Sequence, residues 1–264
     1  MKKKIFSITA MIALLVAIHV EAGTDVHQIM VNNYNVNLGD DVDARITMEL
    51  VEKDYSTKTC ELAMWRLQAD ATIKTLIRFL GPAKVKGISF LSWQYDTKEN
   101  SQWLYLPGFD QAGKVSGSMQ AYSFAGDFSL CDIAPPHPDE FVHRLLGTET
   151  IDGQECYMVE SIHKTYLDDP AYKEKKKSLY SKTVSWIRKD NYLLVKADIF
   201  DQKGKPYKRF EALEVKEIDG TWTISKMVMQ DLVKKHKTIL AIKEIKHGAG
   251  LKSELFDVDK LKNI

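Results

Sequence analysis

The sequence predicts an all-β protein whose strands form one antiparallel sheet. About a dozen short segments with alternating apolar and polar residues follow one another along the chain. Turn-forming pairs such as Asp152-Gly153 and Asp219-Gly220 separate neighbouring segments, as in β-hairpins. No helix of crossover length lies between the segments, which disfavours a parallel α/β architecture. So many sequential strands must curl into a barrel or fold over to hide their edges.

The N-terminus has the three parts of a secretory signal peptide. A positive region, Lys2–Lys4, precedes an uncharged apolar run, Ile5–Ile18. Small residues in Val20–Ala22 then offer a cleavage site, and no cysteine follows it directly. We therefore expect residues 1–22 to be removed and residues 23–264 to fold as a single domain in the periplasm. An uncleaved anchor is the alternative, but the apolar run is short for a membrane span.

The elements of the mature chain follow from the change in apolar spacing. A short amphipathic helix is expected over Asp25–Asn33, capped by Asp25 or by the preceding Thr24. After residue 40 the period changes to two, and Ala44, Ile46 and Met48 alternate with polar residues in a first strand that ends near Leu50. The strands expected after it cover residues 57–68, 72–80, 88–95, 102–106, 142–150, 155–163, 181–188, 193–200, 207–218, 221–232 and 238–247.

The segment from residue 113 to residue 138 is the least regular part of the sequence, and three prolines lie near its end. We expect a long excursion with room for a short helix, because such a segment in a compact domain is usually functional or mobile. The motif His137-x-Asp139-Glu140-x-x-His143 contains metal-ligand residue types. Its spacing is not that of H-E-x-x-H, so we prefer a solvated turn that enters a strand, with a metal site as the alternative.

Charge and cysteine content limit the classes of partner and cofactor. The chain has 37 Lys and Arg against 36 Asp and Glu, so it lacks the basic excess that a nucleic-acid-binding protein needs. Three cysteines, Cys60, Cys131 and Cys156, leave at least one thiol free. A disulfide between Cys131 and Cys156 is the pairing we would expect after export, and three buried thiols are an equally good interpretation.

No motif for catalysis stands out. The run from Gly108 to Val115 nearly matches a phosphate-binding loop, but Val115 replaces the Ser or Thr that would hold magnesium. The sequence has no G-x-S-x-G elbow; the nearest run, Gly87–Leu91, lacks the second glycine. We therefore expect a binding protein, with no cofactor and no enzymatic activity.

An ordered series of short motifs resembles the LolA-like family of outer-membrane lipoprotein-sorting proteins. The motifs are Arg78–Pro82 with Lys86-Gly87, Phe90–Trp93, Gln102–Pro107, Gly126–Ser129, Leu145–Gly147, Ile151–Gly153, Cys156-Tyr157, Tyr180–Lys182 with Trp186 and Lys189, Asp201–Lys205, and Lys216–Trp222. They cover nearly all of the mature chain. After Phe128 the sequence departs from the family pattern, because Leu130–Asp132 replaces the usual aromatic-acidic continuation.

The resemblance implies an incomplete, strongly curved antiparallel β-barrel with short helices plugging its concave side. It also implies a hydrophobic cavity that holds acyl chains of lipids or lipoproteins and moves them across the periplasm without a covalent step. We expect a monomer that could work with an inner-membrane exporter. The alternative is an accessory or docking subunit of such an exporter, without carrier activity of its own.

Apolar and methionine-rich strand positions are the candidates for the cavity lining, because methionine adapts to varied apolar ligands. A one-residue error in register would move a whole strand to the other face, so each position depends on its strand. The expected lining residues are Ile46, Met48, Leu62, Met64, Phe90, Trp103, Met227 and Met229.

Overall fold

The structure is a computed structural model that describes residues 25–36, 41–69, 72–95, 100–109, 111–116, 123–173, 175 and 177–264. The expected signal peptide, residues 1–22, lies outside the described residues. None of the helices in these ranges has the length and apolar character needed to cross a bilayer.

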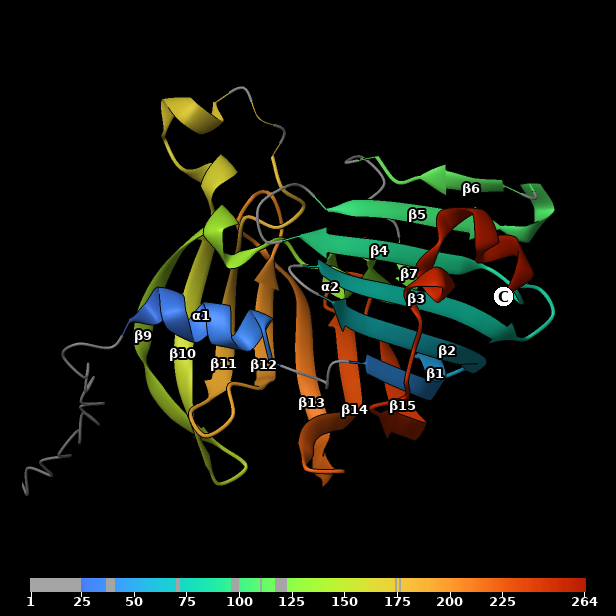
Figure 1. The fold of residues 1–264 in the computed structure, drawn as a ribbon. Helices are drawn as coiled ribbons and strands as arrows, with labels where there is room; N and C mark the ends of the chain where they lie inside the picture. Colours follow the sequence, from blue (N-terminus) through green and yellow to red (C-terminus); the bar gives the residue numbers. More distant parts are fainter. Residues whose placement is uncertain are drawn as a thin grey trace, which may run out of the picture.

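One antiparallel sheet of thirteen strands dominates the fold, in the order β6-β5-β4-β3-β2-β1-β15-β14-β13-β12-β11-β10-β9 (Figure 1). The strands are β1 (Asp41–Val51), β2 (Thr57–Ala69), β3 (Thr72–Gly81), β4 (Ser89–Tyr95), β5 (Ser101–Leu106), β6 (Gln111–Lys114), β9 (Phe141–Ile151), β10 (Gln154–His163), β11 (Lys182–Arg188), β12 (Leu194–Phe200), β13 (Pro206–Ile218), β14 (Thr221–Asp231) and β15 (His236–His247). The expected strands are all confirmed, and β6 is an addition to them.

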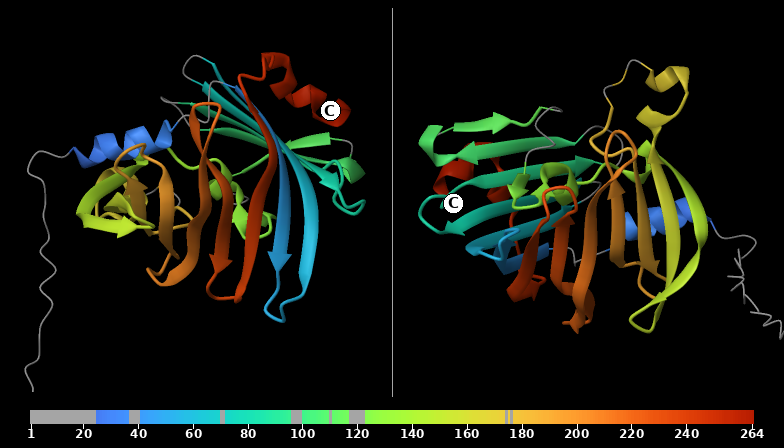
Figure 2. Two further views of the ribbon diagram at one scale, coloured as in Figure 1. Left: turned by 90° about the horizontal axis from the view of Figure 1, so that it is seen from below. Right: turned by 180° about the vertical axis from the view of Figure 1, so that it is seen from behind.

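The sheet is an open, strongly curved barrel. Neighbouring strands are also neighbours in sequence, except for β1 and β15, whose pairing joins the two halves of the sheet. Among the described residues β6 and β9 form its two edges. The strands wrap around the short elements of the central excursion (Figure 2). The predicted incomplete barrel is therefore confirmed.

Short helices and a small hairpin fill the concave side. Helix α1 (Val26–Tyr34) is preceded by its N-cap, Asp25, whose carboxylate accepts a hydrogen bond from the Gln28 amide. The expected irregular segment contains a two-stranded hairpin, β7 (Ser123–Ala125) and β8 (Phe128–Ser129), followed by α2 (Leu130–Ile133). We call residues 123–134 the plug.

Short 3-10 helices complete the connections and the C-terminal end. They are η1 (Pro107–Phe109), η3 (Pro138–Glu140), η4 (Lys164–Tyr166), η5 (Pro170–Tyr172), η6 (Ser253–Phe256) and η7 (Val258–Asn263). The near match to a phosphate-binding loop runs through η1 into the edge strand β6, so no helix N-terminus follows it. The interpretation as a simple glycine-containing loop is confirmed.

Strand register separates two apolar faces. Paired residues in neighbouring strands share a face, so Phe210, Met229 and Ala197 lie together, as do Leu76 and Leu91 on the opposite face. We call the concave group the inner cluster; it comprises Val42, Ala44, Ile46, Met48, Leu62, Ile77, Phe79, Ala125, Phe128, Ala197, Ile199, Phe210 and Met229. We call the convex group the outer cluster; it comprises Leu76, Leu91, Tyr105, Phe256 and Leu261, with Trp65, Trp93 and Trp103 packed against it.

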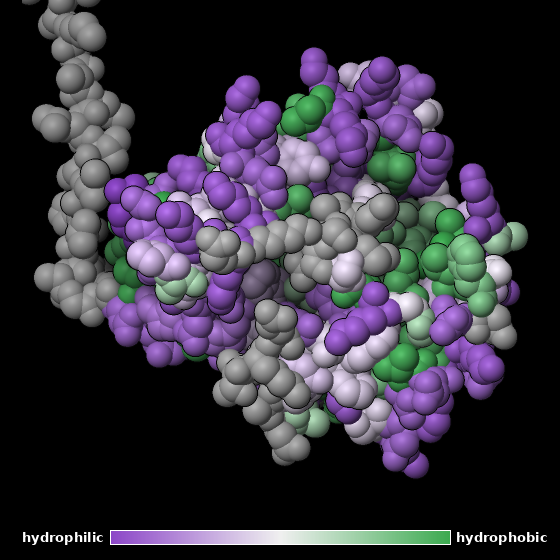
Figure 3. Space-filling view, turned by 90° about the horizontal axis from the view of Figure 1, so that it is seen from above, coloured by the Kyte–Doolittle hydropathy of each residue, from purple (hydrophilic) through white to green (hydrophobic). Residues whose placement is uncertain are grey.

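The C-terminal segment covers the outer cluster. Phe256 of η6 and Leu261 of η7 are fully buried against β3, β4 and β5. The Trp93 indole donates a hydrogen bond to the Phe256 carbonyl at 3.1 Å, and Arg78 donates to the Leu261 carbonyl at 2.9 Å. These bonds satisfy carbonyl groups of the short C-terminal turns. Seen from above, the coloured surface is mostly hydrophilic, with apolar residues gathered toward one side (Figure 3).

The expected disulfide between Cys131 and Cys156 is wrong, because all three cysteines are free. Cys131 lies in α2 on the concave side and contacts the Ser129 hydroxyl at 3.2 Å. Cys156 of β10 is buried on the convex side with Trp186 and Val195. The sheet therefore separates the two sulfur atoms, and the alternative of three thiols is the one that the structure supports.

Candidate functional site

The concave face brings together seven of the eight residues expected to line a cavity. Ile46, Met48, Leu62 and Met229 belong to the inner cluster, and Met64 and Met227 pack against it. Phe90 lies on the same face of the sheet, beneath α2 of the plug. These seven residues lie on one face of the sheet, and whether they line a ligand-binding cavity stays a prediction.

Trp103 is the exception and its expected position was wrong. It pairs with Leu91 in β4 and packs with the outer cluster, beneath the C-terminal segment. Its neighbour Leu104 pairs with Phe90 and lies on the concave side. In β5 the aromatic residues alternate with Leu104, so aromatic content alone pointed to the wrong face.

The plug covers the concave face through apolar side chains. Ala125 and Phe128 belong to the inner cluster. The ring of Phe124 lies 5.4 Å from that of Phe79 and 5.5 Å from that of Phe90, measured between centroids. Leu130 is buried beside Phe90 at the start of α2. The plug therefore covers part of the apolar concave face.

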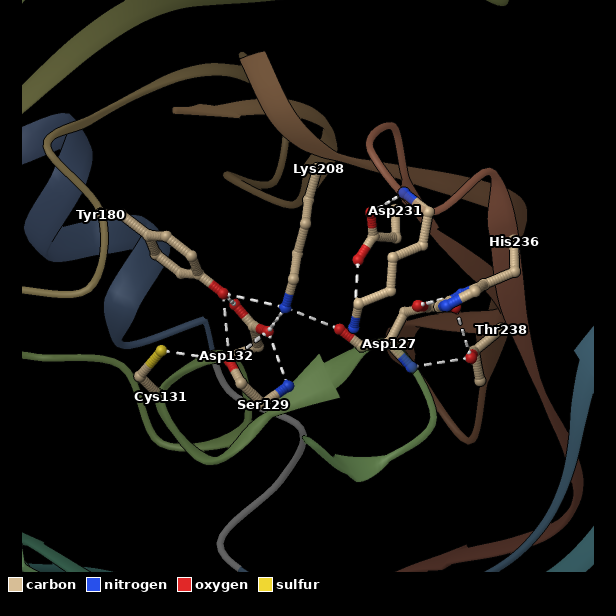
Figure 4. A network of polar contacts seen from close by, with 10 residues as sticks. Asp127, Ser129, Cys131, Asp132, Tyr180, Lys208, Asp231, His236 and Thr238 are labelled. Carbon is tan, nitrogen blue, oxygen red and sulfur yellow. Dashed lines mark hydrogen bonds and ion pairs between the residues drawn. The ribbon is translucent and has the colours of Figure 1, made fainter. Parts of the chain in front are cut away.

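A buried lysine fastens the plug to the sheet (Figure 4). Lys208 of β13 is only 4% exposed, and its ammonium group donates to the Asp127 carbonyl at 2.7 Å. It also forms an ion pair with Asp132 at 3.0 Å and donates to the Tyr180 hydroxyl at 3.0 Å. All three donors of the ammonium are thus used, which is what a buried lysine requires. We call these contacts of Lys208 the first fastener; they join β13, the plug and the segment before β11.

Asp132 is the centre of the plug's own hydrogen bonds. Its carboxylate accepts from the Ser129 amide at 2.7 Å and the Ser129 hydroxyl at 2.6 Å, which closes a capping box at the start of α2. The Tyr180 hydroxyl donates to its other oxygen at 2.8 Å. The segment that departs from the family pattern after Phe128 therefore contains the acid that pairs with Lys208.

A second fastener lies at the tip of the plug. Thr238 of β15 donates its hydroxyl to the Asp127 carboxylate at 2.8 Å and accepts from the Asp127 amide at the same distance. Burial raises the pKa of Asp127, while the Thr238 hydrogen bond and nearby His236 act in the opposite direction. Gly126 allows this close approach, because a Cβ there would lie 2.1 Å from the Thr238 hydroxyl. Its φ of +62° also favours glycine.

The potential nucleophiles of this network are held in their protonated forms. Burial raises the pKa of the Cys131 thiol to about 12, with Asp132 adding to the effect. Burial and Asp132 also raise the pKa of the Tyr180 hydroxyl far above its usual value. A thiol or phenol activated for attack needs a lowered pKa instead. The arrangement is therefore suited to holding the plug in place.

The histidine motif before β9 forms a turn, as preferred from the sequence. The His137 ring accepts a hydrogen bond from the Asp139 amide and caps η3. His143 points elsewhere, with its ring nitrogens 2.8 Å from the Ser161 hydroxyl and 3.0 Å from the Pro138 carbonyl. The two rings serve separate local hydrogen bonds.

Lys208 and Thr238 were not predicted from the sequence as functional residues, although a signal was present. Lys208 shares its face of β13 with Phe210, so a charge lies on an otherwise buried face. Thr238 is the corresponding polar residue of β15, paired with Met229. Polar residues at inward positions of apolar strands would have pointed to a buried partner on a separate segment.

Two open pockets occur elsewhere on the described surface. The larger, of about 490 Å³, is lined by Asn32, Asn35, Val36, Asn191, Tyr192, Gly220, Thr221 and Trp222, beside the end of α1. The smaller, of about 270 Å³, is lined by Asp43, Arg45 and their partners in β15. Neither pocket contains any of the eight expected lining residues.

Comparisons with known proteins agree with this architecture. A family described as an uncharacterized protein has a model that matches residues 71–263. A crystal structure of a DUF1329 family protein from Desulfovibrio piger is 26% identical, with a TM-score of 0.79 over 89% of this chain and 97% of that one. Among curated proteins none matches the chain.

Two further crystal structures share the fold. A domain named for outer-membrane lipoprotein sorting, from Vibrio parahaemolyticus, is 24% identical with a TM-score of 0.78, over 89% of this chain and 97% of that one. A LolA superfamily protein from Nitrosomonas europaea is 17% identical with a TM-score of 0.65, over 88% and 97%. Because the family model covers more than half of the chain, this chain belongs to that family of uncharacterized proteins, and its open curved β-barrel with helices on the concave side is a LolA-like fold.

Proposed function

We propose that this protein is a periplasmic carrier that binds acyl chains of lipids or lipoproteins on its concave face and moves them toward the outer membrane. The carrier-like fold and the lipoprotein-sorting names of its structural relatives support this function. The observation that carries the proposal is the plug: a separate segment with apolar contacts below and charged fasteners at its rim. Binding would be non-covalent, without a cofactor and without catalysis.

The energetics suit exchange between plug and ligand. Burying a chain of about 16 carbons yields a gross ~12 kcal/mol, at ~0.8 kcal/mol per methylene. Displacing the plug exposes Phe124 and Phe128 and opens the Lys208–Asp132 ion pair, so part of this gain is lost. A carrier must also release its cargo, and closure of the plug over the empty face would favour release. Four methionines, Met48, Met64, Met227 and Met229, let the surface adapt to different chains.

An accessory or docking subunit of an envelope exporter is the second candidate. The close packing of the inner cluster beneath the plug favours it, because Leu62 and Met229 are almost fully buried. In that case the convex or edge surfaces would contact the exporter and the concave face would stay closed. The two functions differ in one measurable property, which is whether an acyl chain enters the concave face.

Mass spectrometry of lipids extracted from gently purified protein tests the proposal directly. The carrier function predicts co-purified acyl lipids and saturable binding of a fluorescent fatty acid. Met227→Asp, which places a charge on the half-buried inner face, should weaken binding at least about tenfold while circular dichroism stays unchanged. Met158→Asp is the matched control, because Met158 is equally half-buried but packs on the convex side.

Thiol labelling tests the role of the plug in the same sample. The raised pKa and burial of Cys131 predict slow reaction with iodoacetamide in the closed protein. Adding palmitate should speed labelling of Cys131, while Cys156 on the convex side stays unlabelled. Equal binding by the Met227 and Met158 variants, or no bound lipid at all, would favour the accessory function.

A further inference from the structure

Three side chains of metal-ligand type converge at the tip of the plug. Asp127 of the plug, Asp231 at the end of β14 and His236 at the start of β15 each offer one ligand atom, and these atoms lie within 4.8 Å of one another (Figure 4). Exposed acidic groups often gather without binding anything, but here Asp127 is 4% exposed and Asp231 is 2% exposed. Two buried carboxylates this close together call for a positive partner.

Neighbouring groups hold one oxygen of each carboxylate and leave the other for a ligand. Thr238 donates to Oδ2 of Asp127, and Oδ1 of the same carboxylate lies 2.6 Å from Nδ1 of His236. In Asp231, Oδ1 accepts from the amides of Val233 and Lys234 at 2.9 and 2.7 Å. Hydrogen bonds that orient ligating carboxylates in this way are a usual feature of metal sites.

The imidazole of His236 makes a close contact of poor hydrogen-bond geometry. Its Nδ1 is near enough to Asp127 for an ion pair, yet this buried atom makes no aligned hydrogen bond with any described residue. A ring nitrogen and a carboxylate oxygen thus lie side by side without a hydrogen bond between them, and a shared cation would satisfy both atoms. The side chain of His236 is 18% exposed, which leaves an open side for water as a further ligand.

We propose that Asp127, Asp231 and His236 form a binding site for a divalent cation of the zinc type. Zinc accepts carboxylate oxygen and imidazole nitrogen at about 2.0–2.2 Å, so small side-chain movements would bring the three atoms around one ion. Calcium and magnesium prefer all-oxygen sites, which the imidazole disfavours. A bound ion neutralises the two buried carboxylates and links the plug to the turn between β14 and β15. This site is independent of the carrier function proposed above.

Nearby cations leave room for the ion. The ammonium of Lys208 is already engaged by the carbonyl of Asp127 and the carboxylate of Asp132. Lys234 lies 3.6 Å from Asp231, but its side chain is largely exposed and can turn into solvent. Among the described residues, the fixed charges of the site are therefore dominated by its carboxylates.

The test uses untagged protein from which metal ions have been removed with a chelator, and ZnCl₂ is the probe. Competition against a chromogenic chelator should show one zinc ion per chain, and a thermal melt should show a higher Tm with zinc. His236→Gln and Asp231→Asn should each weaken zinc binding at least about tenfold. They should also melt like the unsubstituted protein without zinc and lose the zinc-dependent rise in Tm. His247→Gln, at the far end of β15, is the matched control and should bind zinc normally.

Two results would overturn the proposal. One is no zinc binding by the unsubstituted protein, which would make the triad a buried ion pair between one histidine and two carboxylates. The other is zinc binding that survives in both His236→Gln and Asp231→Asn, which would place the ion at other histidines. MgCl₂ at the same concentration should leave Tm unchanged, and an equal rise with magnesium would contradict the assignment to a zinc-type ion.

Discussion

The two faces of the same sheet are sealed in different ways. On the convex face, aromatic side chains of β2 to β5 pack against Phe256 and Leu261 of the C-terminal segment. On the concave face, a methionine-rich surface lies beneath a plug held by an ion pair and by the hydroxyl of Thr238. The outer seal combines apolar contacts with hydrogen bonds from Trp93 and Arg78 to backbone carbonyl groups, whereas the inner seal adds an ion pair between buried side chains. The proposed carrier function requires the inner seal to open while the outer seal stays closed.

The largest effect is expected from breaking the outer seal. Phe256→Ala would leave a cavity beneath η6, and such changes typically lower the free energy of unfolding by about 3–5 kcal/mol. Urea denaturation measures this loss. Phe109→Ala is the control, since Phe109 is 79% exposed and its loss should change stability little. A small effect at Phe256 would mean that the C-terminal segment is not part of the core.

Removing Lys208 should lower the free energy of unfolding by less than Phe256→Ala does, but it should loosen the plug more. Lys208→Met would leave the Asp132 carboxylate buried without its cation, which is expected to cost about 3 kcal/mol. The double variant Lys208→Met with Asp132→Asn removes the charge as well and should recover part of this stability. Urea denaturation measures the loss of stability, and the rate of Cys131 labelling, which should rise in Lys208→Met, reports opening of the plug. If labelling stays as slow as in the unsubstituted protein, the Lys208 contacts are not what keeps the plug closed.

A smaller effect is expected from crowding the tip of the plug. Gly126→Ala combines the strain of a positive φ, about 1–2 kcal/mol, with a clash against Thr238. Gly220→Ala is the matched control, because its φ is +76° but no heavy atom lies within 4 Å of the added Cβ. The difference in Tm between the two variants therefore measures the contact between plug and sheet. Equal Tm values would show that the plug can move away from Thr238 without any loss of stability.

The smallest effect concerns an ion pair on the convex side. A hydrogen bond from Lys182 lowers the pKa of Glu160, and Arg144 acts in the same direction. Because the folded-state pKa is lowered, this group stabilises the fold above its ordinary pKa of 4.5, and the stabilisation is lost as pH falls below it. The effect should be less than about 1 kcal/mol.

Glu160→Gln should flatten this part of the stability profile in denaturation series between pH 3 and 6. Glu155→Gln is the control, because Glu155 is exposed on the same strand. A profile that Glu160→Gln leaves unchanged would mean that the ion pair contributes nothing to stability. The difference in stability between the two faces would then come only from the apolar contacts and the plug.

Much of the fold could be predicted because it depends on local patterns. Alternation in β1, the Asp25 cap of α1 and the turn at Asp219-Gly220 each reflect neighbours in sequence, and all were confirmed. Seven of the eight candidate lining positions also lay on one face, because side chains alternate with a period of two. The same alternation explains why the prediction for Trp103 was wrong, since the face on which Trp103 lies depends on the register of β5 with β4.

The sequence by itself determined the strands, their succession along the chain and the apolar character of both faces. The tertiary structure alone decided which face the plug covers, and it brought together groups as distant in sequence as Asp132 and Lys208, or Asp127 and His236. It also placed Cys131 and Cys156 on opposite sides of the sheet. The physical reason is that alternation specifies two faces but not what packs on them. That choice depends on contacts between segments about a hundred residues apart, which no local pattern records.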